Sequence, residues 1–227
     1  KIFEDHYTAS FFATTDHSNA QVASFFPGAM AEAATLSLKD LETKPDLVVV
    51  SPNDPAAMDK AIAECKELGI PYIYDPSQQI IRVDGQTLLQ GLDGALSMFV
   101  NEYEFELVKD KTGLDLDGIM HHLQFLVVTL GPRGATIYHS QGEENIIAAP
   151  TDNILDPTGG GDAFRGGFLT AYRLGLDWET CGRIGSLAAT YCLENEGPQG
   201  HFYTLDEFIA RYYEVFGDDG ALEKLKK

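Results

Sequence analysis

Residues 156–168 read Asp156-Pro157-Thr158-Gly159-Gly160-Gly161-Asp162-Ala163-Phe164-Arg165-Gly166-Gly167-Phe168, a glycine run followed by an acidic residue and the beginning of a helical pattern. Glycine lets consecutive backbone N–H groups turn toward one point, and the positive end of a helix dipole strengthens anion binding there. The stretch therefore predicts a loop that binds phosphate oxygens. Gly159, Gly160 and Gly161 are its candidate donors, and Asp162 lies at its edge.

The carboxylate of Asp162 is the candidate base for phosphoryl transfer. We expect it to stay ionised, because the helix dipole and the neighbouring amides both favour its charged form. A weak base suffices, since in a loose transition state the attacking hydroxyl loses its proton late. The alternative is an ordinary glycine turn whose acid caps a helix. Three successive glycines exceed what a cap requires, and the predicted helix Ala163–Leu174 is rich in small residues, so the functional interpretation is favoured.

The stretch resembles the C-terminal motif D-T-x-G-A-G-D-x-F of the ribokinase-like, or pfkB, family of sugar and nucleoside kinases. Pro157 and Gly160 depart from that motif, but proline keeps the approach extended and glycine leaves the loop open. The resemblance implies a ribokinase-like layered α/β/α fold with a mainly parallel sheet, and a single domain over residues 1–227. Further segments are similar to adenosine-kinase-like bacterial and archaeal members of the family: Thr14-Thr15-Asp16, Phe26-Pro27-Gly28-Ala29-Met30, Asp75-Pro76-Ser77-Gln78-Gln79, Asn101-Glu102-Tyr103-Glu104, Val128-Thr129-Leu130-Gly131 and Gly197-Pro198-Gln199-Gly200-His201.

The composition limits the classes of ligand and partner that the protein is expected to bind. With 16 basic against 35 acidic residues, the net charge of −19 offers nucleic acid no electrostatic footprint. The same charge repels a nucleotide triphosphate, so ATP binding would require local amides, a few cations and Mg²⁺. The longest apolar runs, such as Phe125–Leu130, are too short to span a membrane. Cys65, Cys181 and Cys192 form no C-x-x-C pair, which argues against zinc and disulfides and favours a reducing cytoplasm.

Alternating strand and helix patterns predict a layered α/β sheet. A hairpin is expected first, from Tyr7–Thr15 and Gln21–Phe26 around the polar turn Asp16–Asn19. Ligands of parallel sheets bind at the carboxyl ends of the strands, so Asp75, Asn101 and Gly131 are expected at one rim. The other predicted strands are Leu47–Val50, Tyr72–Tyr74, Met98–Val100, Phe125–Thr129, Ala135–His139 and Asn145–Ala148, and the predicted helices are Pro55–Leu68, Glu102–Lys109, Ala163–Leu174, Trp178–Asn195 and Leu205–Phe216.

Asn101 and Glu104 open the helix that follows the strand Met98–Val100. Their spacing places an amide and a carboxylate on one helix face, from which they could orient water on magnesium and the phosphates. A helix cap explains the same two residues equally well. The family resemblance favours the functional interpretation, because an N-x-x-E element of these kinases takes part in magnesium and phosphate binding.

The turn Thr129–Gly134 carries glycines that would let its backbone approach a ligand. From the residues alone, a plain connection between strands is the favoured interpretation. The resemblance implies instead that this T-L-G-x-x-G turn lies at the ATP site and that two later segments enclose adenine. The residues that it assigns to ATP, besides Asn101 and Glu104, are Thr129, Gly131, Gly134, Ser186, Asn195 and Gly197.

Two further assignments concern a cation and the acceptor. Oxygen atoms of Asp156 and Thr158 could hold a monovalent cation such as K⁺, as in several ribokinase-like enzymes, although an Asx turn explains them at least as well. Ser10, Phe11 and Phe12 match the strand that lines the nucleoside pocket in adenosine-kinase-like members, and Phe12 is the candidate to stack on a purine. From the residues alone, core packing is the favoured interpretation of either ring, and strand alternation points only one inward.

Ribokinase-like kinases usually begin with a segment that has no counterpart here, so we expect the lid and the first strands to be incomplete and the sequence to belong to a longer or truncated chain. The phosphoryl-donor half looks complete. The hypothesis is ATP-dependent phosphoryl transfer to the primary hydroxyl of a nucleoside, with adenosine preferred, Asp162 as base and Mg²⁺ as cofactor. A ribokinase-like sugar kinase and a non-catalytic nucleotide-binding protein are the alternatives, and a homodimer is left open.

Overall fold

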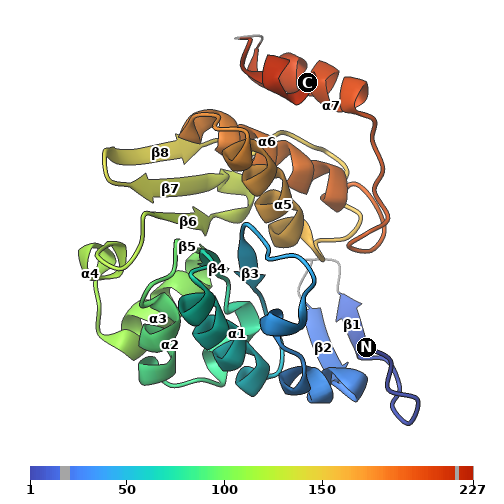
Figure 1. The fold of residues 1–227 in the computed structure, drawn as a ribbon. Helices are drawn as coiled ribbons and strands as arrows, with labels where there is room; N and C mark the ends of the chain where they lie inside the picture. Colours follow the sequence, from blue (N-terminus) through green and yellow to red (C-terminus); the bar gives the residue numbers. More distant parts are fainter. Residues whose placement is uncertain (16–20, 218–219, 227) are drawn as a thin grey trace. The chain divides into compact units, whose positions relative to one another are not determined.

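The computed structural model describes residues 1–15, 21–217 and 220–226 (Figure 1). Strands and helices alternate along the chain as predicted, and six strands form one sheet in the order β3-β4-β5-β6-β7-β8. The chain divides into two compact units, Lys1–Leu126 and Val127–Lys227, which are described in turn. Whether they form the expected single domain stays a prediction, and the predicted turn Asp16–Asn19 lies outside the described residues.

The first unit contains the parallel strands of the sheet. β3 (Val48–Val50) pairs with β4 (Tyr72–Tyr74), and β4 pairs with β5 (Ser97–Asn101), all in parallel register. All three residues of β4 are buried, as expected for a strand covered on both faces. β6 (Phe125–Thr129) begins in this unit. The helices of the unit are α1 (Pro55–Leu68), α2 (Gly85–Leu92), α3 (Glu102–Thr112) and α4 (Leu116–Met120), with 3₁₀ turns at Gly28–Thr35, Leu38–Asp40 and Ser77–Ile81.

Helix α1 shows why a capped segment is predictable. Its N-cap, Asp54, accepts a hydrogen bond from the Ala57 N–H, and Pro55 occupies the first turn. The helix ends at Gly69 in the left-handed conformation, with φ of 60°. The predicted bounds of this helix are confirmed. Helices α2 and α4 were not predicted.

The hairpin near the start of the chain forms a separate two-stranded sheet. β1 (Ser10–Thr15) runs antiparallel to β2 (Gln21–Phe26), with Phe11 opposite Phe25, so β1 begins three residues after the predicted Tyr7. Phe11 and Phe12 are 44% and 67% exposed. The interpretation of either ring as a core residue is therefore wrong.

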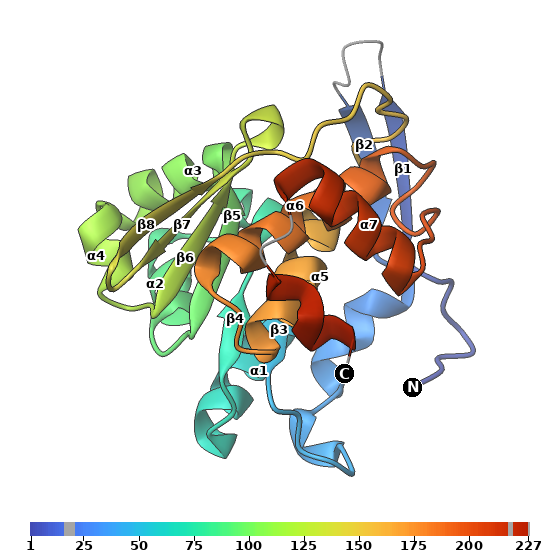
Figure 2. The same ribbon diagram turned by 90° about the horizontal axis from the view of Figure 1, so that it is seen from above.

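The second unit combines an antiparallel strand pair with three long helices (Figure 2). β7 (Ala135–His139) pairs with β8 (Gly142–Ile146), and His139 lies opposite Gly142 across a two-residue connection. This tight connection places β8 earlier than the predicted Asn145–Ala148. The helices are α5 (Gly160–Arg173), α6 (Trp178–Leu193) and α7 (Leu205–Phe216), with 3₁₀ turns at Gly131–Arg133 and Ala221–Lys226.

Helix α6 lies at the centre of this second unit. It packs against α5, α7 and both strands of the β7–β8 pair. Small residues allow the closest approach, since a Cβ atom on Gly167 of α5 would lie 2.9 Å from the Cβ of Ala188 in α6. Among the residues that the structure describes, no helix has the length and hydropathy needed to cross a membrane.

Candidate active site

The predicted anion loop leads directly into α5. Gly159 is the N-cap of this helix in the left-handed conformation, with φ of 87°, and a Cβ atom there would lie 2.5 Å from the Cβ of Pro198. Glycine is therefore required at this position by conformation and by space. The first intrahelical bond runs from the Ala163 N–H to the Gly159 carbonyl, so the N–H groups of residues 160–162 precede it and have no acceptor within the helix.

The space around Gly161, in the first turn of α5, is open. A Cβ atom on Gly161 would meet no atom within 4 Å. Helix N–H groups without an intrahelical acceptor can bind an anion, and binding at this loop stays a prediction. The observed helix begins at Gly160 and not at the predicted Ala163, which places Asp162 inside its first turn.

Asp162 carries its carboxylate next to these amides. Arg165, one helical turn later, donates from Nη2 to Asp162 Oδ1 at 2.7 Å, and the Asp162 side chain is 72% exposed. Desolvation raises the pKa of Asp162 above its ordinary value, so the helix dipole does not dominate as expected. The 72% exposure of the side chain and the adjacent guanidinium favour the charged form, and the expected ionisation of Asp162 stays a prediction.

Asp156 uses both carboxylate oxygens to hold main-chain N–H groups. Oδ1 accepts from the Thr158 N–H at 2.9 Å, and Oδ2 accepts from the Gly197 N–H at 3.0 Å. The hydrogen bonds from Thr158, followed by that from Gly197, lower the pKa of Asp156. The Asx-turn interpretation is confirmed by this geometry. A monovalent cation at Asp156 and Thr158 stays a prediction.

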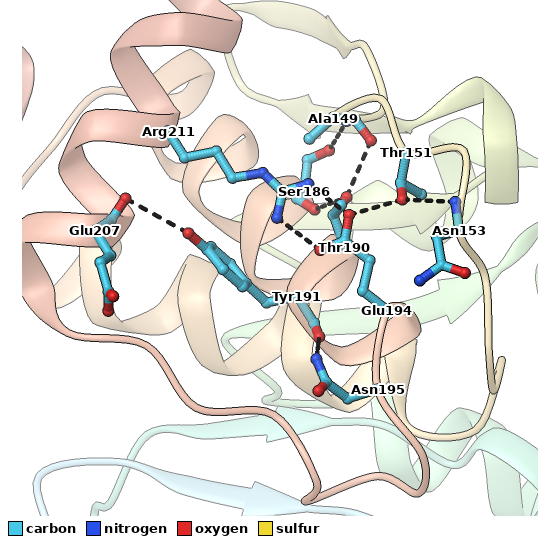
Figure 3. A network of polar contacts seen from close by, with 10 residues as sticks. All are labelled: Ala149, Thr151, Asn153, Ser186, Thr190, Tyr191, Glu194, Asn195, Glu207 and Arg211. Atoms are coloured by element: carbon cyan, nitrogen blue, oxygen red, sulfur yellow. Dashed lines mark hydrogen bonds and ion pairs between the residues drawn. The ribbon is translucent and has the colours of Figure 1, made fainter.

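Two of the residues assigned to ATP, Ser186 and Asn195, form hydrogen bonds within the second unit (Figure 3). The buried hydroxyl of Ser186 accepts from the Ala149 N–H at 2.7 Å and donates to the Ile147 carbonyl at 3.1 Å. Asn195 donates from Nδ2 to the Tyr191 carbonyl at 2.8 Å. Ser186 thus fastens the segment after β8 to α6. Contacts of Ser186, Asn195 and Gly197 with ATP stay predictions.

In the turn after β6, backbone packing alone explains why one of the glycines, Gly134, is needed. Gly134 is buried with φ of 93°, and a Cβ atom there would lie 1.8 Å from the Ile146 carbonyl oxygen. The close approach of the segment ending at Ile146 therefore requires glycine without any ligand. Gly131 is exposed, and no atom would meet a Cβ there within 4 Å. The assignment of Thr129, Gly131 and Gly134 to ATP stays a prediction.

In the first unit, Asn101 and Glu104 form a reciprocal cap on α3. Asn101 Oδ1 accepts from the Glu104 N–H at 2.9 Å, and Glu104 Oε2 accepts from the Asn101 N–H at 2.8 Å. The capping interpretation is confirmed, and it does not consume the remaining lone pairs of the carboxylate. Ser77 donates to Glu104 Oε1 at 3.3 Å, while desolvation raises the pKa of Glu104.

Comparison with known proteins decides the family. The model for pfkB family carbohydrate kinases matches residues 1–204. This chain belongs to the pfkB family. Membership makes the protein a phosphotransferase with a ribokinase-like fold that uses ATP.

Individual relatives agree with this membership. The nucleoside kinase of Methanocaldococcus jannaschii is 30% identical over 209 residues, which cover 92% of this chain and 68% of that protein. The structure of Burkholderia thailandensis nucleoside kinase in complex with inosine superposes with a TM-score of 0.90 at 39% identity, over 94% of this chain and 69% of that one. The same kinase in complex with ADP-inosine gives a TM-score of 0.90 at 39% identity, over 94% and 67%.

Magnesium that binds together with a nucleotide needs few protein ligands, and the residues of this chain fit such an arrangement. Within residues 1–15, 21–217 and 220–226, no three His, Cys, Asp or Glu side chains gather into a metal cluster. Mg²⁺ commonly keeps several waters and takes one or two carboxylates besides substrate phosphates. The Glu104 carboxylate, which has lone pairs left after capping, suits contact through water.

Two polar partners of site residues were not predicted. Arg165 lies three positions after Asp162 on α5, a spacing at which helical side chains meet, so the sequence contained that signal. Ser77 contacts Glu104 across 27 positions of the chain, which no local pattern indicates. Ser77 also has φ of 39°, an uncommon value for a residue other than glycine.

Proposed function

We propose that this protein is a nucleoside kinase that transfers the γ-phosphoryl group of ATP to the primary hydroxyl of a nucleoside, with adenosine preferred. The observation that carries this proposal is the open helix start at Gly160–Asp162, where unsatisfied N–H groups and a carboxylate lie side by side. Phosphoryl transfer requires both, because charge on the moving group must be stabilised while the attacking alcohol is oriented.

Each group has one role in the reaction. Asp162 orients the acceptor hydroxyl and takes its proton as the oxygen bonds to the γ-phosphorus, while the bond to the β,γ-bridging oxygen breaks and ADP leaves. The N–H groups of the predicted donors Gly159, Gly160 and Gly161, together with that of Asp162, stabilise the phosphoryl oxygens. Asn101 and Glu104 would hold Mg²⁺ through water, and the bound ion would neutralise phosphate charge.

The acceptor is supported by resemblance and not by the anion loop, because neither Asp162 nor the amides distinguish one primary alcohol from another. Relatives named as nucleoside kinases, and a related structure with bound inosine, support a nucleoside. Phe12 supports it as well, since its exposed ring is free of the core and can stack on a base.

Steady-state turnover with ATP and a panel of acceptors tests the proposal. We expect kcat/KM to be highest with adenosine, lower with inosine and lowest with ribose or fructose derivatives. Turnover of sugars without nucleosides would replace the proposal by a sugar kinase. ATP binding without turnover of any acceptor would identify a non-catalytic nucleotide-binding protein.

The role of Asp162 has its own test in the variant Asp162→Asn. We expect turnover to fall by about 10²- to 10⁴-fold, the usual contribution of a positioned base, with ATP affinity changed only a few-fold. Asp206→Asn is the matched control, because Asp206 is also an exposed acid in the first turn of a helix, α7. Near-normal turnover of Asp162→Asn would remove the residue from the chemistry.

A further inference from the structure

The C-terminal end of α6 contacts the anion loop through its main chain. We call residues 192–194 the α6 end, residues 156–161 the anion loop, and residues 195–203 the distal loop. The carbonyl of Leu193 accepts two hydrogen bonds, from the Leu155 N–H at 2.8 Å and from the Asp156 N–H at 3.3 Å. The entry of the anion loop is therefore fixed by the last turn of α6.

The distal loop is tied to the same place. The thiol of Cys192 lies 3.5 Å from the Thr158 carbonyl oxygen and 3.7 Å from the Pro198 carbonyl oxygen, within hydrogen-bonding range for sulfur to either loop. The Asp156 carboxylate adds the bond to the Gly197 N–H described above. A shift of the α6 end would consequently move both loops.

An ion pair between two helices holds the α6 end. Arg211 of α7 donates from Nη1 to Glu194 Oε2 at 2.7 Å and from Nη2 to Glu194 Oε1 at 2.5 Å (Figure 3). The two side chains are 24% and 21% exposed, respectively, so the pair is largely shielded from water. Thr151 donates to Glu194 Oε1 at 2.7 Å, which adds the segment before the anion loop. Such a paired, two-bond contact fixes orientation as well as distance.

Arg211 also reaches the distal loop through an aromatic cluster. Its guanidinium carbon lies 4.7 Å from the ring centre of Tyr191, and Tyr191 packs on Tyr203 with ring centres 4.5 Å apart. The Tyr191 hydroxyl donates to the Glu207 carbonyl of α7 at 3.4 Å. The two ends of the distal loop are thus joined to one guanidinium, through Glu194 at its start and through Tyr191 and Tyr203 at its end.

We propose that Arg211 is a positioning residue for phosphoryl transfer. It fixes the α6 end through Glu194 and the aromatic cluster, and the α6 end fixes the N–H groups of the anion loop. The inference rests on the proposed kinase function and extends it to a residue of α7, which follows the glycine run in the sequence after the two helices α5 and α6. The competing explanation is that Arg211 only helps α7 to pack.

The chain offers a matched control for that competing explanation. Arg183 of α6 pairs with Glu179 and lies 5.6 Å from the ring centre of Phe216 in α7. Arg183 therefore also combines an ion pair, here within α6, with a cation–π contact that joins α6 to α7, but it does so in the first half of α6.

The test compares Arg211→Met, Arg211→Lys and Arg183→Met in the whole protein. We expect Arg211→Met to lower kcat by about 10- to 100-fold, the cost of misplacing a reacting group, and to raise KM for ATP while KM for the nucleoside stays unchanged. Arg211→Lys keeps the charge without the two-bond fork and should recover part of the rate. Arg183→Met should show wild-type kinetics.

Two results would overturn the inference. One is that Arg211→Met and Arg183→Met both lose activity in the same proportion to their loss of thermal stability. The other is that Arg211→Met keeps wild-type kinetics. Amide hydrogen exchange separates this failure from failure of the proposed function. Faster exchange at Leu155, Asp156 and Gly197 in Arg211→Met than in Arg183→Met supports positioning of the loops whether or not the wild type turns over. Absence of wild-type turnover overturns the kinase proposal alone, and equal exchange in both variants overturns the positioning.

Discussion

Replacing Gly161 by alanine should separate stability from activity. Gly161 lies in the first turn of α5, and the added methyl group would meet no atom within 4 Å. Alanine is more favourable than glycine in a helix by up to about 1 kcal/mol, which for a chain of this size corresponds to about 2–4 °C in Tm. We therefore expect Gly161→Ala to be as stable as the wild type or more so.

The same methyl group should reduce catalysis, because it occupies the open side from which the phosphoryl group approaches the amides. Loss of one such donor typically costs about 10²- to 10³-fold in kcat. Thermal unfolding followed by circular dichroism gives the first quantity, and ADP release in a coupled assay gives the second. An alanine variant with raised Tm and wild-type kcat would refute the anion-loop assignment.

Two further glycines of this region serve as controls. Gly166 lies in α5, is exposed and would also accommodate a Cβ atom with nothing within 4 Å, so Gly166→Ala should match the stability gain and keep full turnover. Gly159→Ala should destabilise the protein by at least about 1–2 kcal/mol, because the left-handed conformation is unfavourable for alanine and the methyl group would overlap Pro198.

Three other substitutions test separate parts of the structure. Ser77→Gly accepts the positive φ and removes the hydroxyl bonded to Glu104, so a magnesium titration should show unchanged Tm and about 2- to 10-fold more Mg²⁺ at half-maximal rate; an unchanged requirement would contradict the role of Glu104. The Arg211 hydrogen bond lowers the pKa of Glu194, so the pair stabilises the fold above the unfolded-state pKa of about 4.3 and loses this effect as pH falls through the lower folded-state value. The Tm difference between wild type and Arg211→Met should therefore shrink below about pH 4, and a constant difference would exclude this linkage. Phe12→Ala should leave Tm and KM for ATP unchanged and raise KM for the nucleoside by about 2- to 10-fold; an unaltered nucleoside KM would remove Phe12 from the acceptor site.

The sequence predicted those elements whose ends are marked by local chemistry. Helix α7 was placed with its observed bounds, because Thr204 and Glu207 form a reciprocal cap and Gly217 follows its last residue. Helix α2 was missed although Asp84 caps it, since Gly91 weakens its helical pattern. The reason for that glycine lies elsewhere in the chain, because a Cβ atom there would lie 2.3 Å from the ring of Tyr74.

The same distinction holds for the candidate site. The glycine run and Asp162 are contiguous, so their chemistry could be inferred from order alone, and the partner Arg165 was within reach of the helical spacing rule. The bond between Glu194 and Arg211 joins positions 17 residues apart on two different helices. Such a contact results from tertiary packing, and no pattern in a single sequence specifies it.

The Leu193 carbonyl forms a main-chain joint in the second unit, by which we mean its two hydrogen bonds to the start of the anion loop. Truncation of side chains cannot remove these bonds. The two donors are also main-chain groups, at Leu155 and Asp156. Alanine at position 193 or 155 would keep both main-chain hydrogen bonds. An alanine scan would therefore not detect the contribution of these two positions to the rigidity of the neighbouring loops. Proline alone, which has no N–H, would open the joint from the donor side, and the chain places its own proline one position later, at Pro157.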